Sequence, residues 1–338
     1  MKAIIYEGPK TINLRETAEP IAKEDFVKVK VAYAGICGGD MNVYNGTHPR
    51  AKAPLIMGHE AAGTIAEGHP SLPAGTPVAI NPLITCGNCA PCKTGNEHVC
   101  QKLGLYGIDE TGGMAEYMQV PIHRIIPLPK NLDLKMGALA EPMAVVVHAI
   151  RETGYMAGDN ALIFGAGPIG LALALALRTF GCTNLAIVEV NDNRRKFAEN
   201  LGFDTINPIV SDVPKEVLSR TDGNGADHVY DCAGHQSVAN LLSQVVRIKG
   251  NIVIVAHYKK KPEMDFALGM FKEFSIHFVR VYRDIDFKIA TDLLEQEPGF
   301  AKLITHVLPP TDAQKGFDMM LDPATAAVKI LFDFKGGL

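Results

Sequence analysis

The chain has 338 residues, of which 47% are hydrophobic and 21% charged, and its formal net charge is −4. These values describe a globular protein with room for two cores, and they exclude a basic surface for nucleic acid or acidic lipid. Every apolar stretch is far shorter than the roughly 20 residues of a membrane span. The first ten residues, MKAIIYEGPK, contain charged residues that leave no room for the apolar region of a signal peptide. We therefore expect neither a nucleic-acid partner nor a membrane partner.

The first third of the chain consists of short β-type runs separated by Gly and Pro. The predicted strands are residues 1–7, 11–16, 26–36, 75–82 and 115–121. This pattern predicts a mostly β domain with irregular loops.

From about residue 135 the pattern changes to alternating helices and strands. After a helix at 136–153, the predicted strands are 161–167, 184–190, 227–234 and 251–258, and the predicted helices are 168–181, 191–202 and 238–250. This alternation predicts a doubly wound parallel sheet with helical crossovers.

The tail holds a helix at 286–296, polar turns and a strand at 327–334. It lacks Gly-rich cofactor features, so we expect it to return to the first domain. The predicted domains are residues 1–145, 146–284 and the returning tail 285–338.

Four of the seven cysteines lie in one loop, CGNCAPCKTGNEHVC, as Cys86, Cys89, Cys92 and Cys100. Zinc requires thiolates that converge tetrahedrally, and the Gly and Pro residues of this loop allow it to wrap in that way. The alternative is free or disulfide-bonded cysteines, but two-residue spacings strain a disulfide and no secretion signal is present. We predict a closed, structural zinc site. The odd number of cysteines favours a reducing compartment, so we expect a cytoplasmic protein.

A second metal site is predicted from residues that are dispersed along the chain. Cys37 lies in AGICGGD, His59 and Glu60 in LIMGHE, and Glu141 in LAEPM. Thiolate, imidazole and carboxylate are the ligand types of a catalytic zinc, which keeps one position open. Each residue alone has an ordinary structural explanation, so the prediction depends on their order together with the cysteine loop.

A dinucleotide site is predicted where GAGPIG follows an apolar strand and begins a helix. The residues concerned are Gly165, Gly167, Pro168, Ile169 and Gly170. The glycines allow a tight turn and close approach of the pyrophosphate to the helix N-terminus. Glu189, nineteen residues after Gly170, ends the next strand, where an acid binds the adenosine ribose and repels a 2′-phosphate. This favours NAD over NADP, although the positive charges of the nearby Arg194 and Arg195 weaken that preference. Asp231 ends a later strand as either a cofactor neighbour or a turn residue.

Taken together, GICGGD, MGHE, the cysteine loop, GGMAEY, LAEP and GAGPIG resemble the zinc-containing medium-chain dehydrogenase/reductase family, most closely its polyol and threonine dehydrogenase branch. The resemblance covers almost the whole chain. It implies a GroES-like catalytic domain, a Rossmann domain, two zinc ions and NAD, and a homotetramer or homodimer. It assigns the catalytic zinc to Cys37, His59 and Glu60, with Glu141 as a further acidic ligand position. Asp40 matches a carboxylate that orients the imidazole of His59.

The chain also departs from this family. The position that usually carries a proton-relaying Ser or Thr is Gly39, and a usual His is Asn42. Either zinc-bound water and Glu60 relay the proton, or Tyr44, Thr47 or His48 does. In VRVYRD, Val281 occupies a position where sorbitol dehydrogenases carry Arg, with Arg280 and Arg283 on either side.

The implied activity is reversible oxidation of a secondary alcohol to a ketone, with hydride transfer to NAD. A polyol, sugar alcohol or sugar acid is the expected substrate. The candidate pocket residues are Tyr44, Asn45, Thr47, His48 and Arg280. The alternatives are a threonine or butanediol dehydrogenase, and a weakly catalytic or non-catalytic NAD- and zinc-binding regulator. A zinc-free quinone reductase is disfavoured because that class lacks the cysteine loop.

Overall fold

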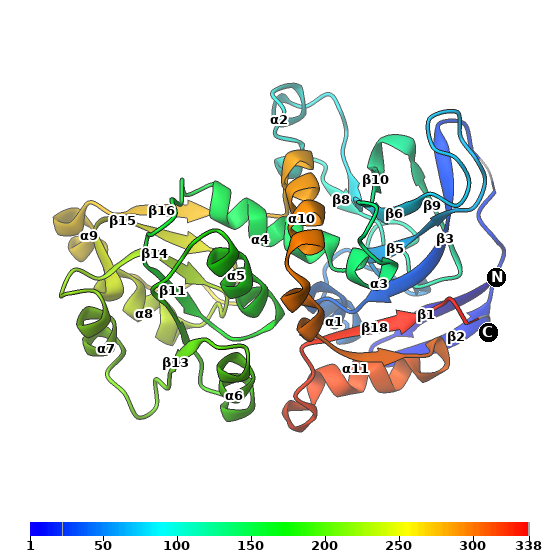
Figure 1. The fold of residues 1–338 in the computed structure, drawn as a ribbon. Helices are drawn as coiled ribbons and strands as arrows, with labels where there is room; N and C mark the ends of the chain where they lie inside the picture. Colours follow the sequence, from blue (N-terminus) through cyan, green and yellow to red (C-terminus); the bar gives the residue numbers. More distant parts are fainter. Residues whose placement is uncertain (22, 337–338) are drawn as a thin grey trace. The chain divides into compact units, whose positions relative to one another are not determined.

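The computed structural model describes residues 1–21 and 23–336 (Figure 1). The chain forms two compact units, Met1–Ala144 with Tyr282–Leu338, and Val145–Val281. Each unit has its own cluster of buried apolar side chains. Among the described residues, no helix is both long and apolar enough to cross a membrane.

The first unit is built on a mixed seven-stranded sheet with the order β10-β6-β5-β3-β18-β17, and β9 also pairs with β3. The strands are β3 (Phe26–Gly35), β5 (Glu60–Ile65), β6 (Pro77–Ile80), β9 (Tyr117–Pro121), β10 (Ile125–Pro127), β17 (Ile304–Leu308) and β18 (Lys329–Asp333). The tail returns to this unit because β18 pairs antiparallel with β3 (Figure 1).

Strand β3 shows why this sheet places the site. Val27, Val29 and Val31 are buried while the intervening lysines are more exposed, which is the period-two pattern of a half-buried strand. The last residues of β3 are buried throughout, because they lie between β5 and β18. The strand leads directly into Cys37 and α1 (Gly38–Tyr44).

The second unit contains a six-stranded sheet with the order β13-β12-β11-β14-β15-β16, and every pair is parallel. The strands are β11 (Ala161–Phe164), β12 (Leu185–Val188), β13 (Asp204–Ile206), β14 (Ala226–Asp231), β15 (Val246–Ile254) and β16 (Ser275–Phe278). The helices are α5 (Pro168–Thr179), α6 (Asp192–Asn200), α7 (Val213–Arg220), α8 (Gln236–Val245) and α9 (Phe266–Lys272). This is the strand order of a doubly wound dinucleotide-binding sheet, as predicted.

Smaller elements complete the first unit. They are the strands β1 (Lys2–Gly8), β2 (Thr11–Glu16), β4 (Leu55–Ile56), β7 (Leu83–Ile84) and β8 (Gly104–Leu105), and the helices α2 (Ala90–Lys93), α3 (Leu134–Gly137), α10 (Asp284–Gln296) and α11 (Ala313–Leu321). Helix α4 (Ala140–Arg151) passes from the first unit into the second.

Three predictions of secondary structure are wrong in detail. The helix predicted for 238–250 ends at Val245, and the following residues begin β15, because they pair with β14. The helix predicted for 136–153 is divided into α3 and α4, since Pro142 is tolerated only in the first turn of a helix. The tail contains β17 and α11 where polar turns were expected.

Candidate active site and metal centres

The four cysteines of the predicted structural site lie together. Among the described residues, they are the one group of His, Cys, Asp or Glu side chains whose ligand atoms all lie within 4.8 Å of one another. The Sγ atoms of Cys89 and Cys92 are 3.4 Å apart, and those of Cys89 and Cys100 are 3.8 Å apart. The loop closes because Gly87 and Gly95 adopt positive φ angles, +69° and +73°, which favour glycine.

Backbone N–H groups face these sulfur atoms. The amides of Gln101 and Cys92 lower the pKa of Cys89 to about 6, and the amides of Asn88 and Cys89 lower the pKa of Cys86. Because the thiolate is the form that binds metal, these amides prepare two sulfurs as ligands. A four-thiolate donor set of this kind fits zinc in a closed site.

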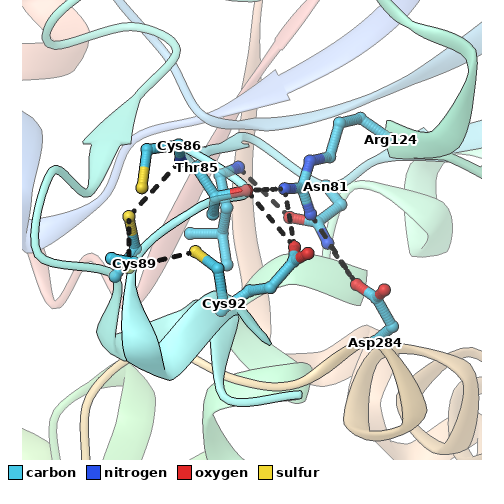
Figure 2. Close-up of polar contacts among 10 residues, drawn as sticks. Asn81, Thr85, Cys86, Cys89, Cys92, Arg124 and Asp284 are labelled. Atoms are coloured by element: carbon cyan, nitrogen blue, oxygen red, sulfur yellow. Dashed lines mark hydrogen bonds and ion pairs between the residues drawn. The ribbon is translucent and has the colours of Figure 1, made fainter. Parts of the chain in front are cut away.

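A buried arginine contacts residues near both ends of the cysteine loop (Figure 2). Arg124 donates from Nη2 to Thr85 Oγ1 at 2.7 Å and to Glu97 Oε2 at 3.1 Å. Thr85 precedes the first cysteine of the loop and Glu97 precedes the last. The Arg124 guanidinium also lies 3.9 Å from Asp284, at the start of α10. One side chain therefore ties both ends of the loop to the rest of the unit.

The second predicted site is formed at the end of β3. Asp40 is fully buried and accepts a hydrogen bond at Oδ2 from the Cys37 backbone N–H, 2.9 Å away. Its other oxygen lies 3.4 Å from His59 Nδ1. Asp40 therefore faces both Cys37 and His59, as expected for a carboxylate that orients the imidazole.

Burial and neighbouring charge act on these ligand candidates in opposite directions. Burial raises the pKa of the Cys37 thiol. Burial lowers the pKa of His59, but Asp40 and Cys37 outweigh that effect and leave it well above its usual range. A buried thiol and imidazole that interact in this way are suited to a cation, which would deprotonate both.

Glu141 lies in the first turn of α4 and is buried, with 6% of its surface exposed. Tyr282 donates its hydroxyl to Glu141 Oε1 at 3.0 Å, across 141 residues of sequence. Burial raises the pKa of Glu141 to about 7. Val281, which precedes this tyrosine, has a φ of +45°, a strained conformation for a β-branched residue.

Glu60, a predicted zinc ligand, has a lysine as its buried partner. Both of its carboxylate oxygens accept hydrogen bonds from Lys329 Nζ, at 2.7 and 2.6 Å. The carboxylate of Glu60 is fully buried, and 4% of Lys329 is exposed. The structure therefore places Glu60 in a buried ion pair.

These residues fit a catalytic zinc by two observations. The imidazole and the carboxylate are buried with the partly buried Cys37 thiol beside the imidazole, and His59 Nδ1 is turned to Asp40 Oδ1 at 3.4 Å, so Nε2 is the ring nitrogen offered to a metal. Cys37, His59 and Glu141 are more loosely gathered than the cysteine loop, because their ligand atoms do not all lie within 4.8 Å of one another. Three protein ligands with an open fourth position are the arrangement of a catalytic zinc.

The glycine-rich turn of the second unit connects β11 to α5. Gly165 has a φ of +100°, and a Cβ on Gly170 would lie 1.9 Å from the Gly165 carbonyl oxygen, so only glycine fits there. The space above Gly167 is open, and Pro168 begins α5. The open backbone at a helix N-terminus suits a pyrophosphate.

Glu189 lies beside this turn. Its carboxylate accepts from the Ala166 N–H and the Asn191 N–H, each at 2.8 Å. Arg195 turns back to the carbonyl of Glu189, whereas the side chain of Arg194 is exposed. Asp231 accepts from the N–H groups of the two residues after Cys232 and from the Tyr258 hydroxyl, so both of its oxygens have partners within the second unit.

The chain is similar to known proteins over most of its length. Residues 23–130 match the alcohol dehydrogenase GroES-like domain, and residues 168–296 match the zinc-binding dehydrogenase family. A 2-dehydro-3-deoxy-L-galactonate 5-dehydrogenase of Pseudoalteromonas atlantica is 34% identical over 95% of both chains. The chain belongs to the zinc-containing medium-chain dehydrogenase/reductase family.

Solved structures of this family agree. The 2R,3R-butanediol dehydrogenase of Bacillus subtilis superposes with a TM-score of 0.91 at 31% identity, covering 98% of this chain and 99% of the other. An Escherichia coli CFT073 protein described as a short chain alcohol dehydrogenase, complexed with NADH, gives 0.90 at 28% identity over 98% and 99%. The predicted two-domain fold, oxidoreductase class and zinc and nicotinamide cofactors are confirmed.

The chain lacks the usual relay groups of this dehydrogenase family, and the structure tests the alternatives. Tyr44 donates its hydroxyl to Asp318 at 2.6 Å, and Thr47 donates to the Asn42 carbonyl at 3.1 Å. His48 Nδ1 accepts from the N–H groups of Arg50 and Ala51, so a neutral ring carries its proton on Nε2. Each of these three side chains is therefore poorly placed to accept a proton from an alcohol.

Gly39→Ser is expected to raise turnover by about tenfold or more, because it restores a hydroxyl where a proton must leave. A Cβ at this position would lie 3.5 Å from His59 Cε1, an ordinary contact, so the side chain fits. Steady-state rates of NADH formation measure the effect. Gly39→Ala is the matched control, since it adds the carbon without the hydroxyl, and equal rates for the two variants would contradict the prediction.

The sequence did not reveal two members of this dehydrogenase site. Lys329 begins a strand whose other positions are mostly buried and apolar, and a lysine in such a strand requires a partner. For Lys329 the available signal was a charged group within an apolar strand. Tyr282 lies in VRVYRD, which alternates apolar and charged residues and gives no such signal.

Proposed function

We propose that this chain oxidises a secondary alcohol of a sugar acid or polyol to a ketone, with zinc and NAD as cofactors. The observation that carries the proposal is the set of Cys37, His59 and Glu141, of which His59 and Glu141 are buried, with buried Asp40 behind the imidazole. The similarity to a galactonate-type dehydrogenase over 95% of both chains favours a sugar-acid substrate.

Two side chains orient the ligand groups of the proposed zinc site. Asp40 holds the imidazole of His59, and Tyr282 holds the carboxylate of Glu141, so that two ligand groups are oriented before metal arrives. Zinc bound there supplies a Lewis acid that lowers the pKa of an alcohol oxygen.

For the cofactor, the Gly165–Gly170 turn would hold the pyrophosphate and Glu189 the adenosine ribose. Both oxygens of Glu189 accept backbone N–H groups, so its negative charge is held at the end of β12. This supports NAD over NADP. Arg194, exposed nearby, is the group that would tolerate a 2′-phosphate.

A substrate panel tests the proposal. NADH and NADPH formation would be measured with sugar acids, polyols, diols and threonine on protein of known zinc content. Turnover confined to sugar acids or polyols supports the proposal. Turnover with butanediol or threonine replaces the substrate class, and full zinc content without turnover on any substrate, in either direction, favours the regulatory alternative.

We further propose that the protein is a homo-oligomer that pairs through the edge of the second unit. Strand β16 is the last of its sheet, and the residues on it and on α9 expose large apolar side chains: Phe266, Met270, Phe271 and Phe278. Exposed apolar groups along an open strand edge favour a second copy as the partner. Sedimentation velocity should give a dimer or tetramer, and Phe278→Lys should reduce its size. A monomeric parent chain would exclude this assembly.

A cytoplasmic setting is proposed as well. None of the seven cysteines forms a disulfide in the structure, which supports a reducing compartment. Fractionation of cells that contain the protein tests this, and recovery from the medium or an oxidising compartment would contradict it.

A further inference from the structure

Arg124 is a buried cation that the proposed chemistry does not use. Its side chain is 3% exposed and contacts Glu97, near the end of the cysteine loop, and Asp284, at the start of α10. These two carboxylates are 41% and 72% exposed. A buried guanidinium is costly unless acceptors and opposite charges face it, so Arg124 favours the positions of the loop and of α10 in which both acids reach it.

Asn81 makes a second contact with the acid at the start of α10 (Figure 2). This residue is fully buried directly after β6, and its backbone N–H donates to the Arg124 carbonyl at 2.8 Å, which continues the pairing of β6 with β10. Its side-chain Nδ2 donates to Asp284 Oδ1 at 3.0 Å. Its Oδ1 accepts from the Leu83 N–H at 3.1 Å, so the amide is bonded at both ends. The start of α10 is therefore held by a strand end as well as by the guanidinium.

The start of α10 also determines where the Tyr282 hydroxyl lies. Tyr282 is fully buried two residues before Asp284, and its ring packs edge-on against Phe287 of α10, with ring centroids 5.2 Å apart. The hydroxyl donates to Glu141 at 3.0 Å. Because a close-packed interior transmits small displacements, a shift of the α10 start would move this hydroxyl relative to Glu141.

We propose that Arg124 is a positioning residue that couples the cysteine loop to Tyr282 and thereby to the predicted ligand position Glu141. The loop with metal bound presents Thr85 and Glu97 to the guanidinium, which then holds the start of α10. Opening of the loop removes those two partners and leaves a buried cation only partly compensated. Metal in the loop therefore favours the α10 position in which Tyr282 orients Glu141. Coupling of this kind is reciprocal, so the Tyr282–Glu141 contact also stabilises the closed, metal-bound loop.

The catalytic consequence rests on the proposed function, but the coupling itself is measurable without turnover. In the His59→Ala variant only the loop should hold zinc, and the rate at which a chromogenic chelator removes that zinc reports loop opening. Arg124→Gln in this background should accelerate release about fivefold or more, which is the size of typical coupling between sites. Tyr282→Phe should also accelerate release, although its hydroxyl bonds to Glu141, outside the loop. A residue that supports the loop only locally would not produce this second effect.

Two comparisons make the result specific. Arg124→Gln combined with Tyr282→Phe should release zinc no faster than Arg124→Gln alone, since one connection carries both effects. Tyr6→Phe is the matched control, because Tyr6 is a buried tyrosine of β1 in the same unit, and it should leave the release rate unchanged. An unchanged release rate in Tyr282→Phe would overturn the inference, whether or not Arg124→Gln folds.

Turnover supplies the second readout. Without the His59 substitution, Arg124→Gln and Tyr282→Phe should lower kcat by similar factors, and their combination by no more than either alone, while the KM for NAD is unchanged. Losses that multiply in the double variant would also overturn the inference. A parent without turnover on any substrate would count against the proposed function, and zinc release would then decide the coupling alone.

Discussion

His59→Ala is expected to abolish dehydrogenase activity while leaving the fold intact. The variant removes one of the ligands of the proposed catalytic metal and leaves Asp40 facing an empty volume. Loss of the Lewis acid removes several kcal/mol of transition-state stabilisation, which corresponds to a decrease in turnover of about 1,000-fold or more. NADH formation and zinc content, measured on the same preparation, check the result.

The zinc content makes the test specific. The parent should hold two zinc ions per chain and the variant one, because the cysteine loop is separate from His59. His69→Ala is the matched control, since His69 lies in a surface turn and contacts Ser71. Retention of two zinc ions or of parental turnover in His59→Ala would contradict the assignment of the active site.

Cys100→Ser should remove the other zinc and destabilise the first unit. Cys100 is the most buried of the four loop cysteines, with 3% of its surface exposed, and its sulfur accepts from the Cys86 and Lys102 N–H groups. Structural zinc contributes directly to folding free energy. A loss of about 4 kcal/mol is expected, which lowers the Tm by about 5–10 °C in a chain of this size.

Thermal unfolding and limited proteolysis would measure this effect, with cleavage expected inside the loop between Cys86 and Cys100. Cys182→Ser is the control, because Cys182 is a buried thiol of the second unit, outside both proposed sites. An unchanged Tm and zinc content in Cys100→Ser would show that the four cysteines do not hold a structural metal.

Motifs whose parts lie close in sequence were predictable. The four cysteines span fifteen residues, and the Gly165–Gly170 turn spans six. Such short loops fold mainly according to their own glycine and proline geometry, so the ligand type and spacing already define the site. The doubly wound sheet was predictable for a similar reason, because each strand and helix carries its own hydrophobic pattern.

Features that depend on pairing between distant segments were not predictable. The residues after Val245 continue a helical pattern, yet they form β15 because β14 is available beside them. Burial in a parallel sheet outweighs local propensity at such a boundary. The same applies to α11 and β17, whose positions depend on the sheet to which the tail returns.

The site itself shows the same division. The sequence alone determined that this protein is a two-domain, zinc- and nicotinamide-dependent oxidoreductase. Short local motifs contain the metal-ligand residue types and the phosphate-binding turn. Only the tertiary structure decided the partner of Glu60, because Lys329 lies 269 residues away and reaches it through the pairing of β18 with β3. A carboxylate next to a candidate ligand histidine has the same sequence signature whether or not an ammonium lies beside it, and only the fold supplies that neighbour.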